Sequence, residues 1–243
     1  MAPMRGLIAR QPMTKLAALA TAAAVPLVIL AFWPLYFSQP LADADRYTHL
    51  HAVAGSLWLM LLIVQPVAIH HERYRLHITL GKISYVLAPL FVVAGVLLSH
   101  YRLSVMSGET FAAEGFSHYL PFYASVVFAL AYVLGLRYRH DAEAHGRFML
   151  LTAIPLIDPV LGRILFFNFP ALPSPWLDQG VTFSVATILA AILVFSYKGP
   201  ARSRRALAIY FVALVALELG WFSASLTPQW LEAVRFFRGL PLT

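Results

Sequence analysis

The stretch from Leu16 to Ser38 reads LAALATAAAVPLVILAFWPLYFS. It contains no charged residue, and a helix needs about 20 mostly apolar residues to cross the hydrocarbon core of a bilayer. The preceding basic residues, Arg5, Arg10 and Lys15, are also typical of a secretory signal peptide. However, the apolar run is longer than the roughly 7–15 residues of a cleaved signal sequence. We therefore interpret it as a retained first membrane span.

Six further stretches share this length and apolarity, without the strict alternation of barrel strands. The predicted spans cover residues 16–38, 48–70, 78–100, 118–137, 148–168, 177–197 and 206–227. Because the connections are short, neighbouring helices should pack antiparallel. The sequence thus predicts an all-α, polytopic transmembrane helical bundle of about seven spans, forming a single domain over residues 1–243. After the last span, residues 229–240 predict an amphipathic helix at the membrane interface, with a disordered tail as the alternative.

The basic residues of the loops predict the orientation. If the N-terminus is cytoplasmic, the cytoplasmic segments hold most of the 18 lysines and arginines, namely Arg5, Arg10, Lys15, Arg73, Arg75, Lys82, Arg137, Arg139, Arg147, Lys198, Arg202, Arg204 and Arg205. The opposite side holds Arg46, Arg102, Arg235 and Arg238, and Arg163 lies within a span. This asymmetry follows the positive-inside rule. We expect a cytoplasmic N-terminus, and the short loops fit a bacterial cytoplasmic (inner) membrane.

Composition excludes several classes of function. The chain is 60% hydrophobic and 12% charged, about half the charged fraction of a soluble domain, so its main solvent is the lipid bilayer. A net charge of +7 does not indicate nucleic-acid binding here, since the basic residues lie in short loops between apolar runs. No cysteine is present, which excludes disulfides and thiolate metal sites. No P-loop, GxGxxG, HExxH or GxSxG motif occurs.

Two acidic residues, Asp158 and Glu218, fall near the middle of predicted spans, where an ionisable group is costly and usually functional. Pro155 and Pro159 flank the first of them and disfavour a regular helix. Freed carbonyls and the Asp158 carboxylate could line a cavity or coordinate a cation. The alternative is an ion pair from Asp158 to Arg163 that holds a kinked helix in place.

The nine histidines fall into two sets. An outer set lies at the ends of spans two, three and four and comprises His49, His51, His100 and His118. An inner set lies on the cytoplasmic side and comprises His70, His71, His77, His140 and His145. In the absence of cysteine, imidazole is the natural ligand for haem iron, copper, zinc or non-haem iron.

Two pairings follow from this sorting. His51 and His118 could meet on the outer side, and His77 and His145 on the inner side, so that two haems would relay electrons across the bilayer. Alternatively, an outer cluster of His51, His100 and His118 could hold a copper, zinc or iron ion. On the second span, Gly55, Trp58 and Gln65 share the helical face of His51, so Trp58 and Gln65 could flank a cofactor.

These residues resemble a group of uncharacterised bacterial multi-pass membrane proteins over roughly residues 48–165. In that group, a His-Arg-x-x-Gly loop precedes one span and a His-x-Arg-x-Met loop precedes another. The matching parts are HAVAGSLW (51–58), Gln65, LHITLGK (76–82), AHGRFMLL (144–151), Asp158 and Arg163. Ile78 stands where the group often has Arg. The resemblance implies a helical membrane fold and no particular activity. More loosely, the His pairs are similar to the plan of cytochrome b561-type electron carriers, which would imply haem near each membrane face.

The leading hypothesis is a membrane-embedded haem- or metal-binding protein for transmembrane electron transfer or metal handling. Its cofactor would be haem b or a transition metal (Cu, Fe or Zn), and any enzymatic activity would be that of an oxidoreductase. The expected cofactor-binding residues are His51, His118, His77, His145, Trp58 and Gln65, with Arg147 and Arg163 neutralising propionates or the oxygen of a quinone or another small ligand.

Two other hypotheses belong to different classes. The chain could be a proton-coupled transporter or channel that uses Asp158 and Glu218. It could also be an accessory or assembly subunit of a larger membrane complex, with a membrane-protein partner and no chemistry of its own.

Overall fold

The protein is described by a computed structural model over residues 12–168, 175–224 and 227–243. Seven helices in it are long and apolar enough to cross a membrane. These spans are Lys15–Phe37, Arg46–His70, Tyr74–Val105, Gly115–Arg137, Ala142–Asn168, Trp176–Phe195 and Ala201–Ala224. No strand occurs within those described ranges. The predicted all-α transmembrane bundle of seven spans is confirmed, while the direction in which it crosses the membrane stays a prediction.

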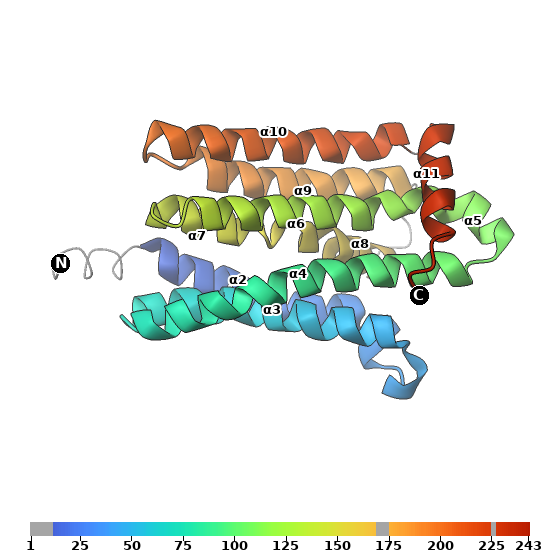
Figure 1. Cartoon of the computed structure of the whole chain (residues 1–243), viewed down its shortest axis with the longest axis horizontal. Helices are drawn as coiled ribbons and strands as arrows, with labels where there is room; N and C mark the ends of the chain where they lie inside the picture. The colour runs from blue at the N-terminus through green and yellow to red at the C-terminus, as the bar shows by residue number, and fades with distance from the viewer. Residues whose placement is uncertain (1–11, 169–174, 225–226) are drawn as a thin grey trace.

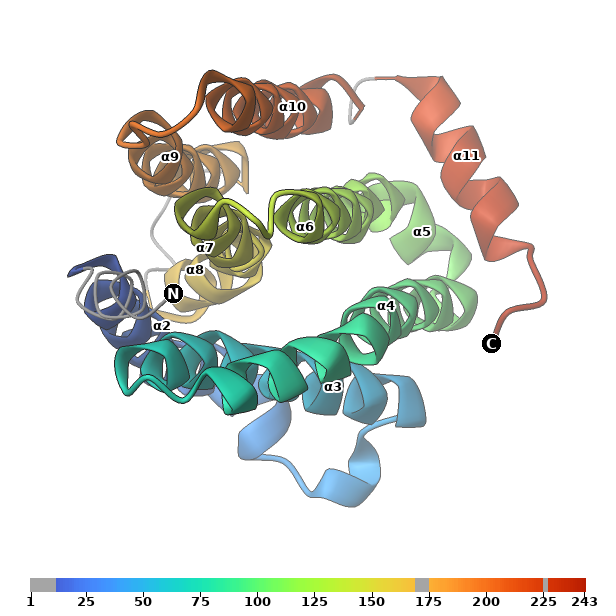
Figure 2. The same cartoon turned by 60° about the vertical axis from the view of Figure 1, so that its left-hand side comes forward.

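The helices form two connected layers (Figure 2). The first contains α2 (Pro12–Phe32), which continues into a π-helical turn at Trp33–Phe37, followed by α3 (Arg46–His70) and α4 (Tyr74–Val105). The second contains α6 (Tyr119–Arg137), α7 (Ala142–Leu151), α8 (Ile157–Asn168), α9 (Pro175–Phe195) and α10 (Ala201–Ala224). Packing of α4 on α6 and of α2 on α8 joins the layers.

The bundle has two ends that differ in character. We call one the basic end; it carries the turns at 71–73, 138–141 and 196–200, on the side where α2 begins (Figure 1). We call the other the capped end, because short helices cover it: a turn at Leu41–Asp43, α5 (Gly108–Glu114), a 3₁₀ turn at Gly115–His118, and α11 (Pro228–Arg238).

Helix α11 runs across the capped end instead of along the bundle (Figure 1). The indole N–H of Trp230 donates to the carbonyl of Phe116 at 3.0 Å, and Val234 is buried against Leu103 and Phe111. The segment expected to be an interfacial helix is therefore helical. Its position at the membrane surface stays a prediction.

Small residues form much of the contact surface between the spans. Ala94, Ala131, Ala144 and Ala190 are fully buried, whereas large side chains such as Val86 are exposed on the outside. Lipid tails are as apolar as leucine, so close packing of small residues replaces the hydrophobic effect as the force between helices.

The fifth span is broken into α7 and α8 by a 3₁₀ turn at Ile154–Leu156. Pro155 lies at the start of that turn and Pro159 in the first turn of α8, where a missing N–H is tolerated. The Thr152 hydroxyl donates to the carbonyl of Met149 at 2.6 Å, next to the break. The proline pair thus interrupts the helix, as its sequence indicates.

Candidate functional site

The clearest candidate site is a pair of histidines at the basic end. His77 is in the first turn of α4 and His145 in the first turn of α7. Their imidazole centres lie 6.3 Å apart, with the ring planes at 83°. Both side chains are half-buried. The structure therefore brings together the inner pair expected from the sequence.

The hydrogen bonds of this pair leave ring nitrogens free. His145 Nδ1 lies 2.8 Å from the carbonyl oxygen of Gly135 on α6. A carbonyl only accepts, so Nδ1 carries the proton and Nε2 keeps its lone pair. His77 Nδ1 is buried and has no hydrogen-bond partner. His145 thus has the arrangement of a ligand histidine, whose second nitrogen is usually held by a backbone carbonyl or a carboxylate, whereas His77 Nδ1 has no such support.

Gln65 and Trp58 are the α3 residues expected beside a cofactor. A Cβ placed on Gly81, one turn beyond His77, would lie 3.9 Å from Gln65 Nε2, while the buried Gln65 Oε1 has no partner. Trp58 Nε1 donates to the hydroxyl of Thr152 at 3.0 Å, beside the break in the fifth span. Its ring packs edge-on against aromatic side chains of α6. Trp58 thus anchors α3 to α6 and α7, and Gln65 lies against α4 beside Gly81.

The outer histidines have separate surroundings. His51 stacks on Phe91 with ring centres 4.8 Å apart, and its buried Nδ1 has no partner. His100 is 1% exposed, and its Nδ1 lies 2.7 Å from the hydroxyl of Thr243. His118 Nδ1 is buried without a partner. In residues 12–168, 175–224 and 227–243, no group of three or more metal-ligating side chains is assembled. The expected His51, His100 and His118 metal cluster is therefore not formed there, and the aromatic neighbour of His51 is Phe91 and not His118.

The two arginines expected to face a cofactor are directed elsewhere. Arg147 is 3% exposed and donates to Glu143 at 2.7 Å, to Ser196 Oγ at 2.6 Å and to the carbonyl of Leu193. Through the contacts with Ser196 and Leu193, Arg147 fastens α7 to α9. It lies two residues after His145, so its side chain is on a different face of the helix from the histidine.

Arg163 donates to the carbonyl of Pro159 at 2.8 Å and lies 4.6 Å over the ring of Phe32. In the described part of the chain, the ion pairs within 4.0 Å are Arg102 with Asp45 and Arg147 with Glu143. Asp158 and Arg163 therefore make no direct ion pair within 4.0 Å, although their opposite charges interact at longer range. Arg163 is instead held by a carbonyl of its own helix and by an aromatic face.

Both mid-membrane acids accept hydrogen bonds from neutral donors on other helices. Asp158 Oδ1 accepts from Thr182 Oγ1 at 3.0 Å and from the amide of Gln179, both on α9. Glu218 Oε1 accepts from Tyr123 OH at 3.1 Å, and its Oε2 accepts from the hydroxyl of Thr187. Sequence reasoning missed these four donors. The one signal for them is the spacing of Gln179 and Thr182, which places both on one face of a helix.

A second acidic site lies outside the spans, at the basic end. Asp141 caps α7 by accepting from the Ala144 amide at 3.1 Å, and it also accepts from Ser203 Oγ at 2.6 Å and from the Tyr197 hydroxyl. Burial acts to raise the pKa of Asp141, but the hydrogen bonds from Ser203, Tyr197 and the backbone outweigh it and hold that pKa below its usual value. Burial and the bond to Asp141 raise the pKa of Tyr197 to about 12.

The fold and these sites define a seven-span helical membrane protein with a paired-histidine site and two buried acids. Comparisons with protein-family models, with curated proteins and with solved structures find no match to this chain.

Proposed function

We propose that this chain is a membrane haem protein that would hold one haem b at the basic end, with His77 and His145 as the residues that would bind its iron. The observation that carries the proposal is the approach of the two imidazoles to 6.3 Å from different helices. A metal ion between two imidazole nitrogens, about 2 Å from each, leaves the ring centres roughly 6 Å apart. The carbonyl of Gly135 fixes the tautomer that keeps His145 Nε2 available.

The donor set favours haem over a bare metal ion. Structural and catalytic metal sites use three or four protein ligands. In the described ranges, no third histidine or carboxylate joins the pair. Haem iron needs only two axial ligands from the protein, since the porphyrin supplies the other four. When bound, the haem would supply one-electron chemistry, and this chain's part is to orient the two imidazoles and to exclude water.

We propose one haem in this protein, and not two haems placed near opposite faces of the membrane. The plan of two haems needs a second histidine pair at the capped end, and His51, His100 and His118 have different neighbours there. We place the protein in a bacterial cytoplasmic membrane, with the basic end and the haem on the cytoplasmic side, because the basic loops gather at that end.

Absorption spectroscopy of protein purified from haem-supplied cells tests the proposal. We expect a Soret band and about one haem per chain by pyridine haemochrome. His77→Ala and His145→Ala should lose most of the haem, whereas His140→Ala, an exposed histidine at the same end, should keep it. Protein without a Soret band, or with stoichiometric copper or zinc in its place, contradicts haem binding.

A second candidate function, a proton-coupled transporter, rests on a separate observation. Asp158 and Glu218 lie in membrane-spanning helices with hydroxyl and amide donors and no cationic side chain within 4.0 Å in the described ranges. The charge of Arg163 acts on Asp158 from beyond contact distance. A buried carboxylate without a cation in contact holds a proton readily, so each acid is suited to carry one.

Proton uptake into proteoliposomes tests this second function. Asp158→Asn should abolish the flux without lowering the yield of folded protein. Glu232→Gln, at an exposed acid on α11, is the matched control and should leave the flux unchanged. An unaltered flux in Asp158→Asn, or none in the wild type, counts against transport.

A further inference from the structure

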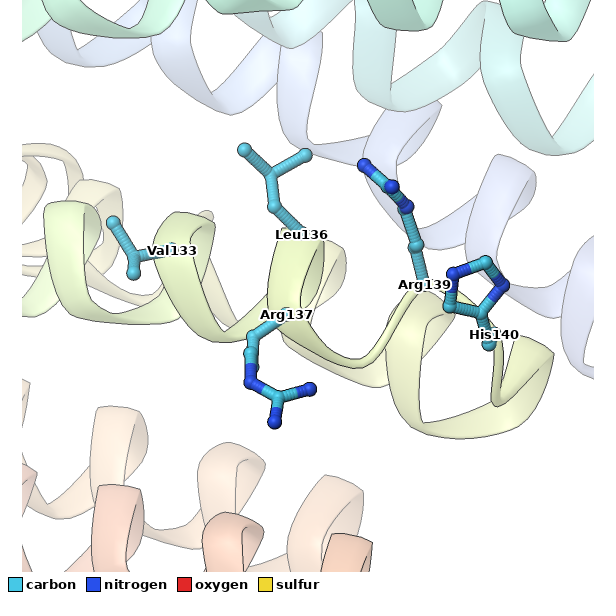
Figure 3. Close-up of a pocket in the computed structure, with 5 residues that line it drawn as sticks. All are labelled: Val133, Leu136, Arg137, Arg139 and His140. Carbon is cyan, nitrogen blue, oxygen red and sulfur yellow. The ribbon is translucent and has the colours of Figure 1, made fainter.

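A pocket of about 420 Å³ opens where α6 ends at the basic end (Figure 3). Its lining divides into two parts. Val133, Leu136 and Arg137 belong to the last turns of α6, which ends at Arg137, and Arg139 and His140 lie in the turn that follows. Figure 3 shows the two arginine side chains leaving the helix end on opposite sides. The pocket is an open surface hollow that joins an apolar wall on the span to a basic rim at the end of the span.

The basic rim carries uncompensated charge. In the described residues, no carboxylate lies within 4.0 Å of Arg137, Arg139 or His140. Asp141 is the next residue in the chain, but it accepts from the hydroxyls of Tyr197 and Ser203 instead. The Asp141 carboxylate, which could have balanced the charge of the rim, therefore bonds to residues at the end of α9 and the start of α10 instead.

Arg137 and Arg202 share an aromatic neighbour, Tyr138. The guanidinium of Arg137 lies 5.9 Å from the ring centre of Tyr138, and the guanidinium of Arg202 lies 5.9 Å from the same ring. These cation–π contacts bring a further positive charge near the rim from the start of α10. A smaller pocket of about 230 Å³ at the same end has a similar make-up, with Lys15 beside Ala18, Leu19 and Val67.

We propose that the Arg137–Arg139–His140 pocket binds the headgroup of an anionic phospholipid, with an acyl chain along Val133 and Leu136. An anionic headgroup matches the charge, and the chain matches the apolar wall. The residues of this site are different from the histidine pair, and the proposal does not depend on haem binding.

Native mass spectrometry of the full chain in mild detergent tests the proposal by titration with phosphatidylglycerol and phosphatidylcholine. We expect phosphatidylglycerol to bind at least about tenfold more tightly. In Arg137→Gln/Arg139→Gln its affinity should fall by about tenfold or more, since each basic residue at an anionic surface contributes roughly fivefold. Arg139→Gln alone should lose about fivefold, which keeps the test available if the double variant misfolds.

The matched control is Arg204→Gln/Arg205→Gln, which removes the same charge from exposed residues at the same end. It should keep the wild-type affinity. Equal losses in the two double variants would mean diffuse attraction and overturn the site. Displacement of the lipid by inorganic phosphate or glycerol phosphate at the same concentration would also overturn it, because a free anion would then be the ligand.

Discussion

Asp141 shows how one side chain fastens the basic end. It holds the start of α7, the end of the α9 span and the start of α10 together, through the Ala144 amide and the hydroxyls of Tyr197 and Ser203. Because its folded pKa is lower than its ordinary value, the ionised carboxylate bonds better in the folded protein than in the unfolded chain. Its contribution to stability therefore depends on pH.

We predict that Asp141→Asn lowers the thermal midpoint by about 2–4 °C at neutral pH, corresponding to about 1 kcal/mol, while the amide oxygen still caps α7. The carboxylate's contribution is fully present above the unfolded pKa of about 3.9 and is lost as pH falls through the lower folded pKa. The gap between wild type and variant should thus stay constant down to about pH 5 and shrink below about pH 4. Tryptophan fluorescence melts in detergent measure it, and a gap that widens in acid would contradict the assignment.

A site residue can be predicted from the sequence when it interrupts the apolar pattern of a span. Asp158 and Glu218 stand out because each is a charge in an apolar run, and their role as buried acids could be proposed from that alone. Their donors, such as Tyr123 and Thr187, are ordinary in membrane helices and sit on other spans. No local signal pairs them with the acids, whereas Arg163 is close in sequence to Asp158 and so is the partner that the sequence offers as an alternative.

At the scale of elements, α6 is the support on which the histidine pair rests. Helices α4 and α7 both pack on α6, and its Gly135 carbonyl accepts from His145. Hydrophobic run length predicts the spans, and loop charge places His77 and His145 at one end. The approach of α4 to α7 depends on side-chain packing against a third helix, which run length and spacing do not encode.

A substitution at Gly135 tests whether the close contact between α6 and α7 positions His145. A Cβ there would overlap Met149 Cε and lie 3.3 Å from Phe148 Cβ, both on α7. We expect Gly135→Ala to turn the flexible end of Met149 aside and to press on Phe148 Cβ, and so to destabilise the protein by about 1–3 kcal/mol and to lower its haem content. Thermal melts and pyridine haemochrome measure the two effects.

Gly146→Ala is the control for this substitution. Gly146 follows His145 on α7, and nothing lies within 4 Å of a Cβ placed on it. It should leave haem content unchanged and stabilise the helix by about 0.5–1 kcal/mol. If Gly135→Ala behaves in the same way, the close contact between α6 and α7 does not position His145.

The whole molecule presents a basic end, where α2 begins, and a capped end, where α11 lies, with seven apolar spans in the described residues between them. The natural chain has no cysteine, so single introduced cysteines report on sidedness without background. Exposed positions are available at both ends: His140 and Lys198 at the basic end, and Glu109 and Glu232 at the capped end. We predict that the basic end faces the cytoplasm, because basic loops are retained there.

In intact cells, a membrane-impermeant maleimide should therefore label Glu109→Cys and Glu232→Cys. His140→Cys and Lys198→Cys should react only after permeabilisation. The reverse pattern would place the basic end outside and overturn the orientation, and with it the cytoplasmic side assigned to the histidine pair and the lipid pocket. Labelling of all four positions in intact cells would indicate mixed insertion, which a charge asymmetry this strong should prevent.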